Sequence, residues 1–307
     1  MEKTSNENDV KKNIEKALTK KITSFSLKGR GYCNDAHYLE TDDGGVYIAK
    51  VDRELKEFRP QNSLMVEAKV IKQLYELNLS IAVPRIVFEN KNMFGYEYIE
   101  GDMLKTVWGS LSEDERISIC RKLGQFHAEI GKKFSKEMAT ACGVKINASL
   151  GLHPEVEKEY EAILAGTDVP EEYKVLAQEA RIMFDETTNH GGIFQFIHND
   201  SHHENILIKN KTISGIIDFG EAEYGEVAKE FSRYIRDFPD YFQHIVSSYE
   251  EASGNKLSYA RLVSNAFLSG LIDSIESFRK GGEERLRAEA SMSIYKKLMR
   301  CSALLTT

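Results

Sequence analysis

Residues 196–225, with the sequence FIHNDSHHENILIKNKTISGIIDFGEAEYG, constrain the fold more than any other part of this chain. Two short apolar runs, at residues 206–208 and 215–217, flank the polar stretch of residues 209–214. Apolar runs that surround a polar turn are typical of an antiparallel β-hairpin. We therefore expect a hairpin here, with its turn in residues 209–214.

The open end of this hairpin gathers polar side chains. Facing residues in an antiparallel pair have position numbers with a constant sum, so if Leu207 faces Ile216, then Asn205 faces Asp218. Asp200 lies in the loop that leads into this end. Oxygen atoms that converge on one point suit Mg²⁺, which takes carboxylate and phosphate oxygens and keeps several waters. We predict that Asn205 and Asp218 are metal ligands.

The spacing of these residues is typical of kinases. His198, Asp200 and Asn205 form the pattern H-x-D-x-x-x-x-N, and Asp-Phe-Gly follows at residues 218–220. In that arrangement the first Asp accepts the proton of an attacking hydroxyl, while the Asn and the second Asp hold metal on the nucleotide phosphates. A polar turn beside a buried hairpin would explain any one of these elements but not all of them in order. We predict that Asp200 is catalytic and that His198 braces the loop.

Other metal sites are not expected. His202 and His203 suggest zinc, but adjacent residues of an extended segment point to opposite sides, and no further ligand is spaced to join them. The cysteines form no C-x-x-C pair, which favours free thiols in a reducing cytosol over a disulfide framework. They are Cys33, Cys120, Cys142 and Cys301.

Upstream of the hairpin, the chain offers a lysine and an acid that suit a nucleotide. Lys50 ends a strand-like run at residues 46–50, and Glu67 lies beside Leu64 and Ile71 on the next predicted helix. In kinases a strand lysine held by a helix carboxylate is a fixed positive charge for the phosphates. We predict that Lys50 and Glu67 form this pair.

Two further segments are candidates for nucleotide contacts through the main chain. Gly29 and Gly31 lie between two predicted strands, where backbone amides can approach phosphates. Two glycines fall short of the G-x-G-x-x-G pattern, and a plain hairpin turn remains an alternative. Residues 96–101 form an extended run in which the backbone of Glu97 and of Ile99 would contact an adenine ring.

The order of predicted elements indicates an α+β fold. Residues 1–98 read as a small antiparallel sheet with one important helix, which carries Leu64, Ala68, Ile71 and Tyr75 on one face. The expected strands include residues 36–41, 46–51, 85–89 and 94–99. Residues 99–307 read mainly as helices, the first opened by a Ser112–Glu115 capping box. We predict an N-terminal nucleotide-binding lobe at 1–98 and a catalytic and substrate-binding lobe at 99–307.

With these elements the chain resembles the aminoglycoside phosphotransferase and choline kinase superfamily, the small-molecule relatives of protein kinases. The resemblance rests on the segments named above, on LGQFHAEIG at 123–131, on HNDSHHENILI and on IIDFG. It implies a two-lobed protein-kinase-like fold, catalysis by Asp200, Mg²⁺ at Asn205 and Asp218, and ATP at Lys50 with Glu67 behind it. The sequence is less consistent with a protein kinase, since no A-P-E motif or long activation segment follows residue 220.

The acceptor is less constrained by the sequence. The net charge of −7 and pI of about 5.7 argue against a nucleic-acid partner and are compatible with a small, cationic hydroxyl substrate. Aminoglycosides, amino alcohols such as choline, and metabolites such as homoserine or methylthioribose all remain open. A pseudokinase interaction module is disfavoured, because Lys50 and the residues at 200, 205 and 218 are intact.

Departures from the superfamily concern the substrate side. The family pattern G-D-P-x-x-D corresponds here to Gly225, Glu226, Val227 and Glu230, and the chain ends in a basic to neutral segment. Residues 153–186 carry ten acidic and three basic side chains, which suits either a cation-binding wall or a charged solvent-exposed surface. No run approaches the roughly 20 apolar residues that span a bilayer. We expect a cytoplasmic protein without membrane contact.

Overall fold

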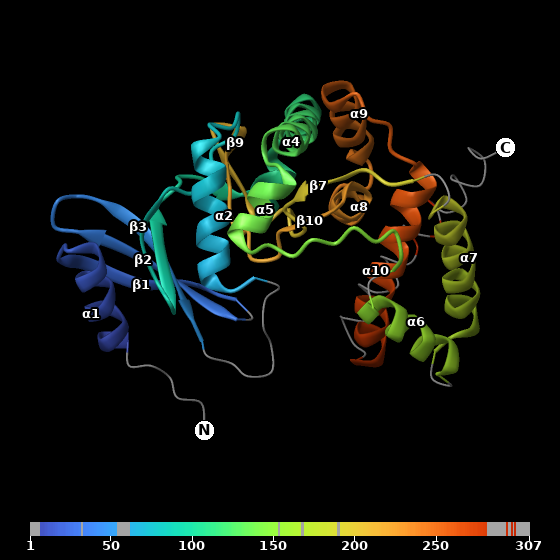
Figure 1. Cartoon of the computed structure of the whole chain (residues 1–307), viewed down its shortest axis with the longest axis horizontal. Coiled ribbons are helices and arrows are strands. Elements are labelled where there is room, and N and C mark those ends of the chain that lie inside the picture. The colour runs from blue at the N-terminus through green and yellow to red at the C-terminus, as the bar shows by residue number, and fades with distance from the viewer. Residues whose placement is uncertain are drawn as a thin grey trace. The chain divides into compact units, whose positions relative to one another are not determined.

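The structure is a computed structural model that describes residues 7–31, 33–53, 62–152, 154–166, 169–188 and 191–280, together with residues 293, 296 and 298. Its elements are labelled in Figure 1. The chain forms two compact units. Unit 1 comprises Met1–Glu115, Glu129–Ile146 and His198–Tyr224, and unit 2 comprises Arg116–Ala128, Asn147–Ile197 and Gly225–Thr307. These units do not follow the predicted division after residue 98, and the assignment of functional lobes stays a prediction.

Unit 1 contains a five-stranded antiparallel sheet with the strand order β1-β2-β3-β5-β4. The strands are β1 (Ile22–Arg30), β2 (Asn34–Thr41), β3 (Val46–Asp52), β4 (Ile86–Asn90) and β5 (Met93–Glu97). Each strand that the sequence predicts here is present. The strand expected at 94–99 ends at Glu97, so residues 98–101 leave the sheet.

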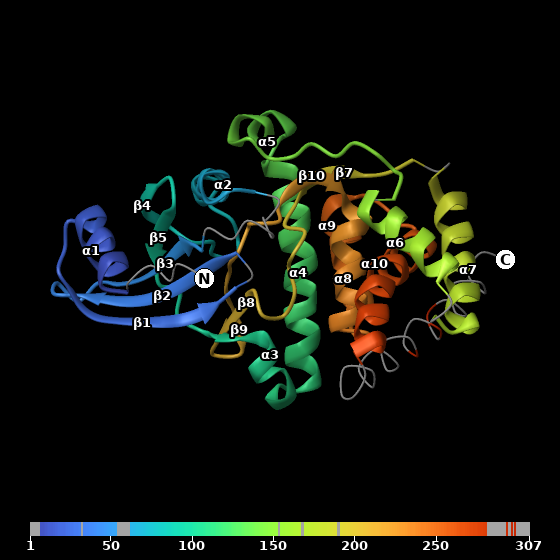
Figure 2. The ribbon, with the colours of Figure 1, turned by 90° about the horizontal axis from the view of Figure 1, so that it is seen from below.

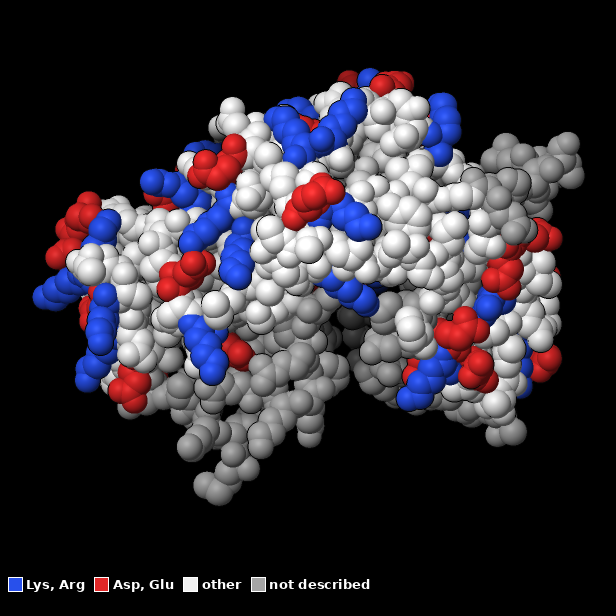
Figure 3. All heavy atoms as spheres, in the orientation of Figure 1, with Lys and Arg blue, Asp and Glu red and all other residues white. Residues whose placement is uncertain are grey.

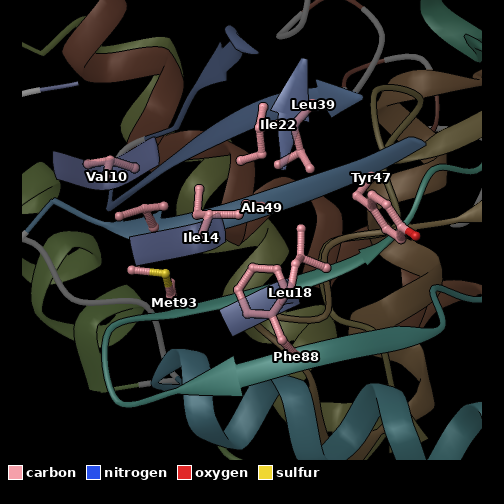
Figure 4. Packing of buried hydrophobic residues seen from close by; sticks show 10 residues of the cluster. Val10, Ile14, Leu18, Ile22, Leu39, Tyr47, Ala49, Phe88 and Met93 are labelled. Atoms are coloured by element: carbon pink, nitrogen blue, oxygen red, sulfur yellow. The ribbon is translucent and has the colours of Figure 1, made fainter. Parts of the chain in front are cut away.

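One face of this sheet is covered by α1 (Glu7–Leu18), which buries Val10, Ile14 and Leu18 at helical spacing. Figure 4 shows these side chains packed among apolar side chains of the strands, with Tyr47 and Ala49 of β3 in the same cluster. Successive strand residues point to opposite faces. Lys50, which follows Ala49, therefore points away from α1.

Helix α2 (Leu64–Glu76) begins at Ser63, whose side chain accepts a hydrogen bond from the backbone N–H of Val66. Leu64, Ala68 and Ile71 are buried as predicted. Tyr75 is 45% exposed, so its assignment to the buried stripe was wrong. Leu74 is buried instead, together with Glu67 and Val70, so the buried face of α2 lies to one side of the predicted stripe.

The predicted hairpin is present as β8 (Ile206–Lys209) and β9 (Thr212–Ile216), and β6 (Asp102–Met103) pairs with β8. Figure 2 shows α3 (Leu104–Val107) beside β8 and β9. The turn is tighter than expected, since only Asn210 and Lys211 lie between the strands. Both have left-handed φ values, 51° and 63°, as a two-residue type I′ turn requires.

The other elements of unit 1 are short, and one long helix belongs to both units. The short elements are η1 (Trp108–Ser110) and α5 (Lys136–Cys142). The long helix, α4 (Glu113–Lys133), begins with the predicted capping box of Ser112 and Glu115. Its predicted stripe is buried, at Ile119, Leu123, Phe126 and Ile130. The capping box and the buried stripe that the sequence of residues 112–130 predicts are therefore both present.

Unit 2 is mainly helical, as predicted. Its helices, besides part of α4, are α6 (Pro154–Ala165), α7 (Glu171–Thr188), α8 (Val227–Asp237), α9 (Phe242–Ser253) and α10 (Tyr259–Lys280). Strand β7 (Phe194–Ile197) and part of β10 (Glu223–Glu226) also belong to it. Figures 1 and 2 both place α8 beside α10. Gly124 of α4 must be glycine, because a Cβ there would lie 2.2 Å from the carbonyl oxygen of Ile245 in α9.

A buried arginine joins several segments of unit 2. Arg261 of α10 is 4% exposed and donates to both carboxylate oxygens of Glu226, each at 2.8 Å. It also donates to the backbone carbonyls of Phe184 and Leu150. Its guanidinium carbon lies 3.7 Å from the ring centroid of Phe184. All three guanidinium nitrogens of Arg261 thus donate hydrogen bonds inside the unit.

The helices α6 and α7 carry charges of both signs. Over them, Figure 3 shows Lys and Arg side chains mixed with Asp and Glu. Arg181 pairs with Glu157 and, at 2.8 Å, with Asp185, while Lys174 lies 3.7 Å from Glu171. The acidic side chains of this region are therefore partly neutralised by their own neighbours.

The described residues include no helix with the length and apolar character that a membrane crossing needs.

Candidate active site

Lys50 is the centre of a buried charge network in unit 1. Its residue is 8% exposed, and its ammonium donates to Glu67 Oε1 at 2.8 Å and to Oε2 at 3.0 Å. The expected Lys50–Glu67 contact is therefore present. The same ammonium donates to Asp218 Oδ1 at 2.8 Å. One lysine thus joins the sheet, α2 and the segment after β9.

The three charges shift each other's pKa values. Burial lowers the pKa of Lys50, but the carboxylates of Asp218 and Glu67 more than offset this and raise it above its ordinary value. Burial raises the pKa of Glu67 to about 7, although Lys50 limits the rise. Partial burial raises the pKa of Asp218, but Lys50 holds it below its ordinary value. Lys50 and Asp218 are therefore charged at neutral pH, whereas Glu67 titrates there.

The hairpin register differs by one residue from the expected one. Ile206 pairs with Ile216 and Leu207 pairs with Gly215, so the expected pairing of Leu207 with Ile216 is wrong. At the open end, the backbone N–H of Ile217 donates to the carbonyl of Asn205 at 3.0 Å. An irregularity after Leu207 changes the constant sum along the hairpin, which a short apolar pattern does not reveal.

As a result, Asn205 faces Ile217 and not Asp218. Asp218 follows directly, with a left-handed φ of 67° that takes its backbone out of the strand direction. Its carboxylate then contacts Lys50. Asn205 and Asp218 still lie at the same end of the hairpin, although they do not face each other as a strand pair.

Asp200 and Asn205 are in direct contact across their loop. The side-chain amide of Asn205 donates to the backbone carbonyl of Asp200 at 2.9 Å and to its Oδ2 at 3.2 Å. Asn199, just before Asp200, has a left-handed φ of 61°, which turns the chain into the loop. Because the amide nitrogen of Asn205 engages Asp200, its amide oxygen is the atom directed elsewhere and suited to a cation.

His198 braces this loop, as expected. Its Nδ1 accepts a hydrogen bond from the backbone N–H of Asp200 at 3.2 Å, and its Nε2 lies 3.0 Å from the carbonyl of Ile217. Its ring centroid is 4.4 Å from that of Phe219. The residue is fully buried. It therefore links the loop before β8 to the segment after β9.

The donor set fits a magnesium ion that is shared with nucleotide phosphates. One amide oxygen from Asn205 and one carboxylate from Asp218 would supply two hard oxygen ligands, and Mg²⁺ takes its remaining ligands from water and phosphate. The described residues contain no group of three His, Cys, Asp or Glu side chains that could hold a metal ion without such partners. The rings of His202 and His203 have centroids 6.0 Å apart.

Of the two glycines predicted to contact phosphates, only Gly31 lies in a turn. Gly29 belongs to β1, where it pairs with Ala36, and a Cβ there would meet no atom within 4 Å. Gly31 lies in the turn, where its N–H donates to the carbonyl of Asn34 at 2.9 Å. Arg53 donates to the carbonyl of Gly31 at 3.1 Å and so fixes this turn. Phosphate binding by either glycine stays a prediction.

Residues 98–101 of the extended run leave the sheet after Glu97. The N–H of Glu97 donates to the carbonyl of Arg85 at 3.1 Å, and that of Tyr98 donates to Val46 at 3.0 Å. Within the described part of the chain, the N–H of Ile99 donates no backbone hydrogen bond. This suits a main-chain contact with an adenine ring, which stays a prediction for Glu97 and Ile99.

Sequence reasoning missed Tyr96 as a neighbour of the charged network. Tyr96 is buried, and burial raises its pKa, with Lys50 and Asp218 close enough to act on it. It pairs with Ile48, and Ile48 shares a strand face with Lys50. The alternation of β3 and β5 could have placed the Tyr96 ring on this face.

The fold and the site together define the class of kinase-like phosphotransferases, in which a small antiparallel sheet carries the lysine and a hairpin loop carries the reacting carboxylate. The model of the phosphotransferase enzyme family (APH) matches residues 28–262. The chain belongs to this family, and it is an enzyme, a small-molecule kinase. A search of curated protein sequences found no significant match.

Several solved structures have a similar fold. The GDP and kanamycin complex of APH(2")-IIia is 16% identical, with 97% of this chain and 99% of that chain covered and a TM-score of 0.68. The streptomycin–ATP ternary complex of APH(2")-IIa is 15% identical, with 97% of each chain covered and a TM-score of 0.63. The macrolide 2'-phosphotransferase MphH from Brachybacterium faecium is 16% identical, with 91% and 96% covered and a TM-score of 0.67.

The titration of Glu67 predicts an acid limb in the pH profile. Since burial raises the pKa of Glu67 to about 7, its charge is present above that pH and is lost as the pH falls through it. Lys50 then loses one partner, so we expect kcat/KM to decline below a pH of about 7. Initial rates across this range measure the effect. The Glu67→Gln variant should be slower and should lack this limb, and a flat wild-type profile would contradict the assignment.

The same proton has the opposite effect on folding. Glu67 binds its proton more tightly in the folded chain than in the unfolded chain, so the folded state takes up a proton between its ordinary pKa of 4.5 and about 7. The contribution of Glu67 to the free energy of unfolding is therefore fully present below 4.5 and is lost as the pH rises through about 7. The acid limb thus reports loss of charge and not loss of fold.

Proposed function

We propose that this enzyme transfers the γ-phosphoryl group of ATP, with Mg²⁺, to a hydroxyl group of a small molecule of the aminoglycoside or amino-alcohol type. The observation that carries the proposal is the double contact of Lys50 with Glu67 and Asp218, at the same hairpin end as the Asp200–Asn205 contact. A fixed cation for phosphates and a carboxylate for a hydroxyl proton are what phosphoryl transfer needs from a protein.

Each residue has a defined task in the proposed reaction. Lys50 neutralises charge on the nucleotide phosphates, and Glu67 fixes its position. Asp200 accepts the proton of the acceptor hydroxyl as the acceptor oxygen bonds to the γ-phosphorus and the bond to the β–γ bridging oxygen breaks, which leaves ADP. The proton then passes from Asp200 to solvent. Most of the rate enhancement comes from positioning and from charge stabilisation.

Asn205 and Asp218 would hold Mg²⁺. When bound, the ion stabilises negative charge on the phosphates. Asp218 is ready for this task because Lys50 keeps its carboxylate ionised. Gly31, Glu97 and Ile99 would add main-chain contacts to the phosphates and the base.

The nature of the acceptor rests on charge and on relatives. The chain has a net charge of −7, which is compatible with a cationic substrate. Relatives of this fold were solved with kanamycin and with streptomycin, and another is a macrolide phosphotransferase. An antibiotic acceptor would give the enzyme a role in antibiotic resistance. A cytoplasmic location, where ATP is available, stays a prediction.

The test is ADP release from ATP and Mg²⁺ with a panel of acceptors. The panel contains kanamycin, streptomycin, a macrolide, choline, ethanolamine, homoserine and methylthioribose, and mass spectrometry identifies the phosphorylated product. We expect one acceptor to raise ADP release well above the rate without acceptor. The Asp200→Asn variant supplies the background. Stimulation by a metabolite alone would overturn the antibiotic assignment, and product formation at the wild-type rate in Asp200→Asn would overturn the site.

A further inference from the structure

His202 lies in the catalytic loop, two residues after Asp200, and its position is fixed by the backbone. Its N–H donates to the carbonyl of Asp200 at 2.8 Å, and its own carbonyl accepts from the N–H of Asn205 at 2.9 Å. The loop is thus closed on itself around His202. These bonds fix the backbone from which the imidazole projects.

The hydrogen bonds of the imidazole determine its tautomer. The backbone N–H of Glu204 donates to Nδ1 of His202 at 3.2 Å. A backbone amide can only donate, so Nδ1 is the acceptor and carries no proton. A neutral imidazole has one donor and one acceptor nitrogen, and the proton is therefore on Nε2 of His202.

The protonated nitrogen faces the reacting carboxylate. Nε2 of His202 lies 3.5 Å from Oδ2 of Asp200 and 3.4 Å from the amide nitrogen of Asn205. That amide already donates to two oxygen atoms of Asp200. Two N–H groups do not bond to each other, whereas Oδ2 of Asp200 is an acceptor within reach of the Nε2 proton. Such contacts tighten when substrate binds.

We propose that His202 is a positioning residue that, together with Asn205, holds Oδ2 of Asp200 and so directs Oδ1 toward the acceptor hydroxyl. The inference rests on the proposed function, because it concerns the same proton transfer. Asn205 and His202 both contact Oδ2 of Asp200. Two contacts to the same oxygen fix the rotation of the carboxylate about the Cβ–Cγ bond. The side chains of His202 and Asp200 are 22% and 25% exposed, so a solute can approach this pair.

The main test compares His202→Ala with His202→Gln. Gln keeps a side-chain N–H that can reach Oδ2, whereas Ala removes it. We expect His202→Ala to lower kcat about tenfold to a hundredfold, since a small misplacement of a reacting group has effects of this size. KM for ATP should stay within about twofold, and His202→Gln should recover most of kcat. His244→Ala, on α9, is the matched control and should keep wild-type kcat.

A double variant separates positioning from a structural role. In the Asp200→Asn background, where the reacting carboxylate is already lost, His202→Ala should cause little further loss of rate. We expect slow release of ADP with water as the acceptor, and following it allows this measurement before the acceptor is known. Unchanged kcat in His202→Ala, or a loss that adds fully to that of Asp200→Asn, would overturn the inference.

A spectroscopic measurement tests the geometry without activity. The ¹⁵N spectrum of the histidine side chains, with His202→Gln as the assignment control, should show the Nε2–H tautomer for His202. That signal should shift in Asp200→Asn. A proton on Nδ1 would overturn the inference even if the enzyme is active. Conversely, an Nε2–H signal in a protein that forms no ADP with any acceptor or with water would count against the proposed function alone.

Discussion

The Asp200→Asn variant is expected to lose about a hundredfold to ten-thousandfold in kcat, because the acceptor hydroxyl loses the group that takes its proton. The amide has nearly the same shape as the carboxylate and can still contact Asn205. ATP binding should change little, since Lys50, Glu67 and Asp218 lie outside the Asp200–Asn205 contact. Steady-state kinetics and nucleotide titration by calorimetry measure the two quantities separately.

The control for this variant is Asp185→Asn on α7, an exposed carboxylate that contacts Arg181. It removes the same charge from the chain but leaves the hairpin loop intact, and it should keep wild-type kcat. If Asp200→Asn lost ATP affinity in proportion to kcat, its role would be in nucleotide binding. Unchanged kcat with an active acceptor would remove Asp200 from the mechanism.

The second large effect concerns stability. We expect Arg261→Met to lower the free energy of unfolding by about 3 to 5 kcal/mol, the cost of leaving a buried carboxylate without its partner. That carboxylate is Glu226, whose side chain is only 11% exposed. Arg261→Lys should recover part of the loss, because an ammonium keeps the charge but cannot contact both oxygens and both carbonyls. Urea unfolding followed by circular dichroism measures these differences.

A more exposed arginine of the same unit is the matched control. Arg181 pairs with Glu157 and Asp185 but is 27% exposed, so Arg181→Met should cost no more than about 1 kcal/mol. The double variant Arg261→Met/Glu226→Gln should be more stable than Arg261→Met, since it no longer buries an unpaired charge. Equal costs for Arg261→Met and Arg181→Met would show that burial does not decide the effect.

Much of the site could be predicted from sequence because its residues occupy fixed places in short elements. The apolar runs on each side of a polar turn were sufficient to predict the β8–β9 hairpin, and the run before Lys50 predicted β3. This pattern did not predict which residues of β8 and β9 pair with each other. A register that differs by one residue keeps the same apolar runs in both strands, so the sequence does not distinguish Ile217 from Asp218 as the partner of Asn205.

Long-range contacts were harder to predict than local ones. The sequence predicted the Lys50–Glu67 contact, which joins neighbouring elements, but it gave no sign that Asp218 also bonds to Lys50. The helical period alone did not distinguish Leu74 from Tyr75 as the inward residue of α2. The contact of His202 with Asp200 depends on the closed shape of the loop, which only coordinates reveal.

The discontinuity of unit 1 has a consequence for how the protein is made. Lys50 and Asp218 are separated by 168 positions, and the first 115 residues belong to the same compact unit as residues 198–224. During synthesis, the N-terminal sheet therefore emerges long before the hairpin that completes its charge network. Bringing such distant segments together has a high entropic cost and slows folding. Until the hairpin is made, Lys50 can pair only with Glu67, and its contact with Asp218 forms last.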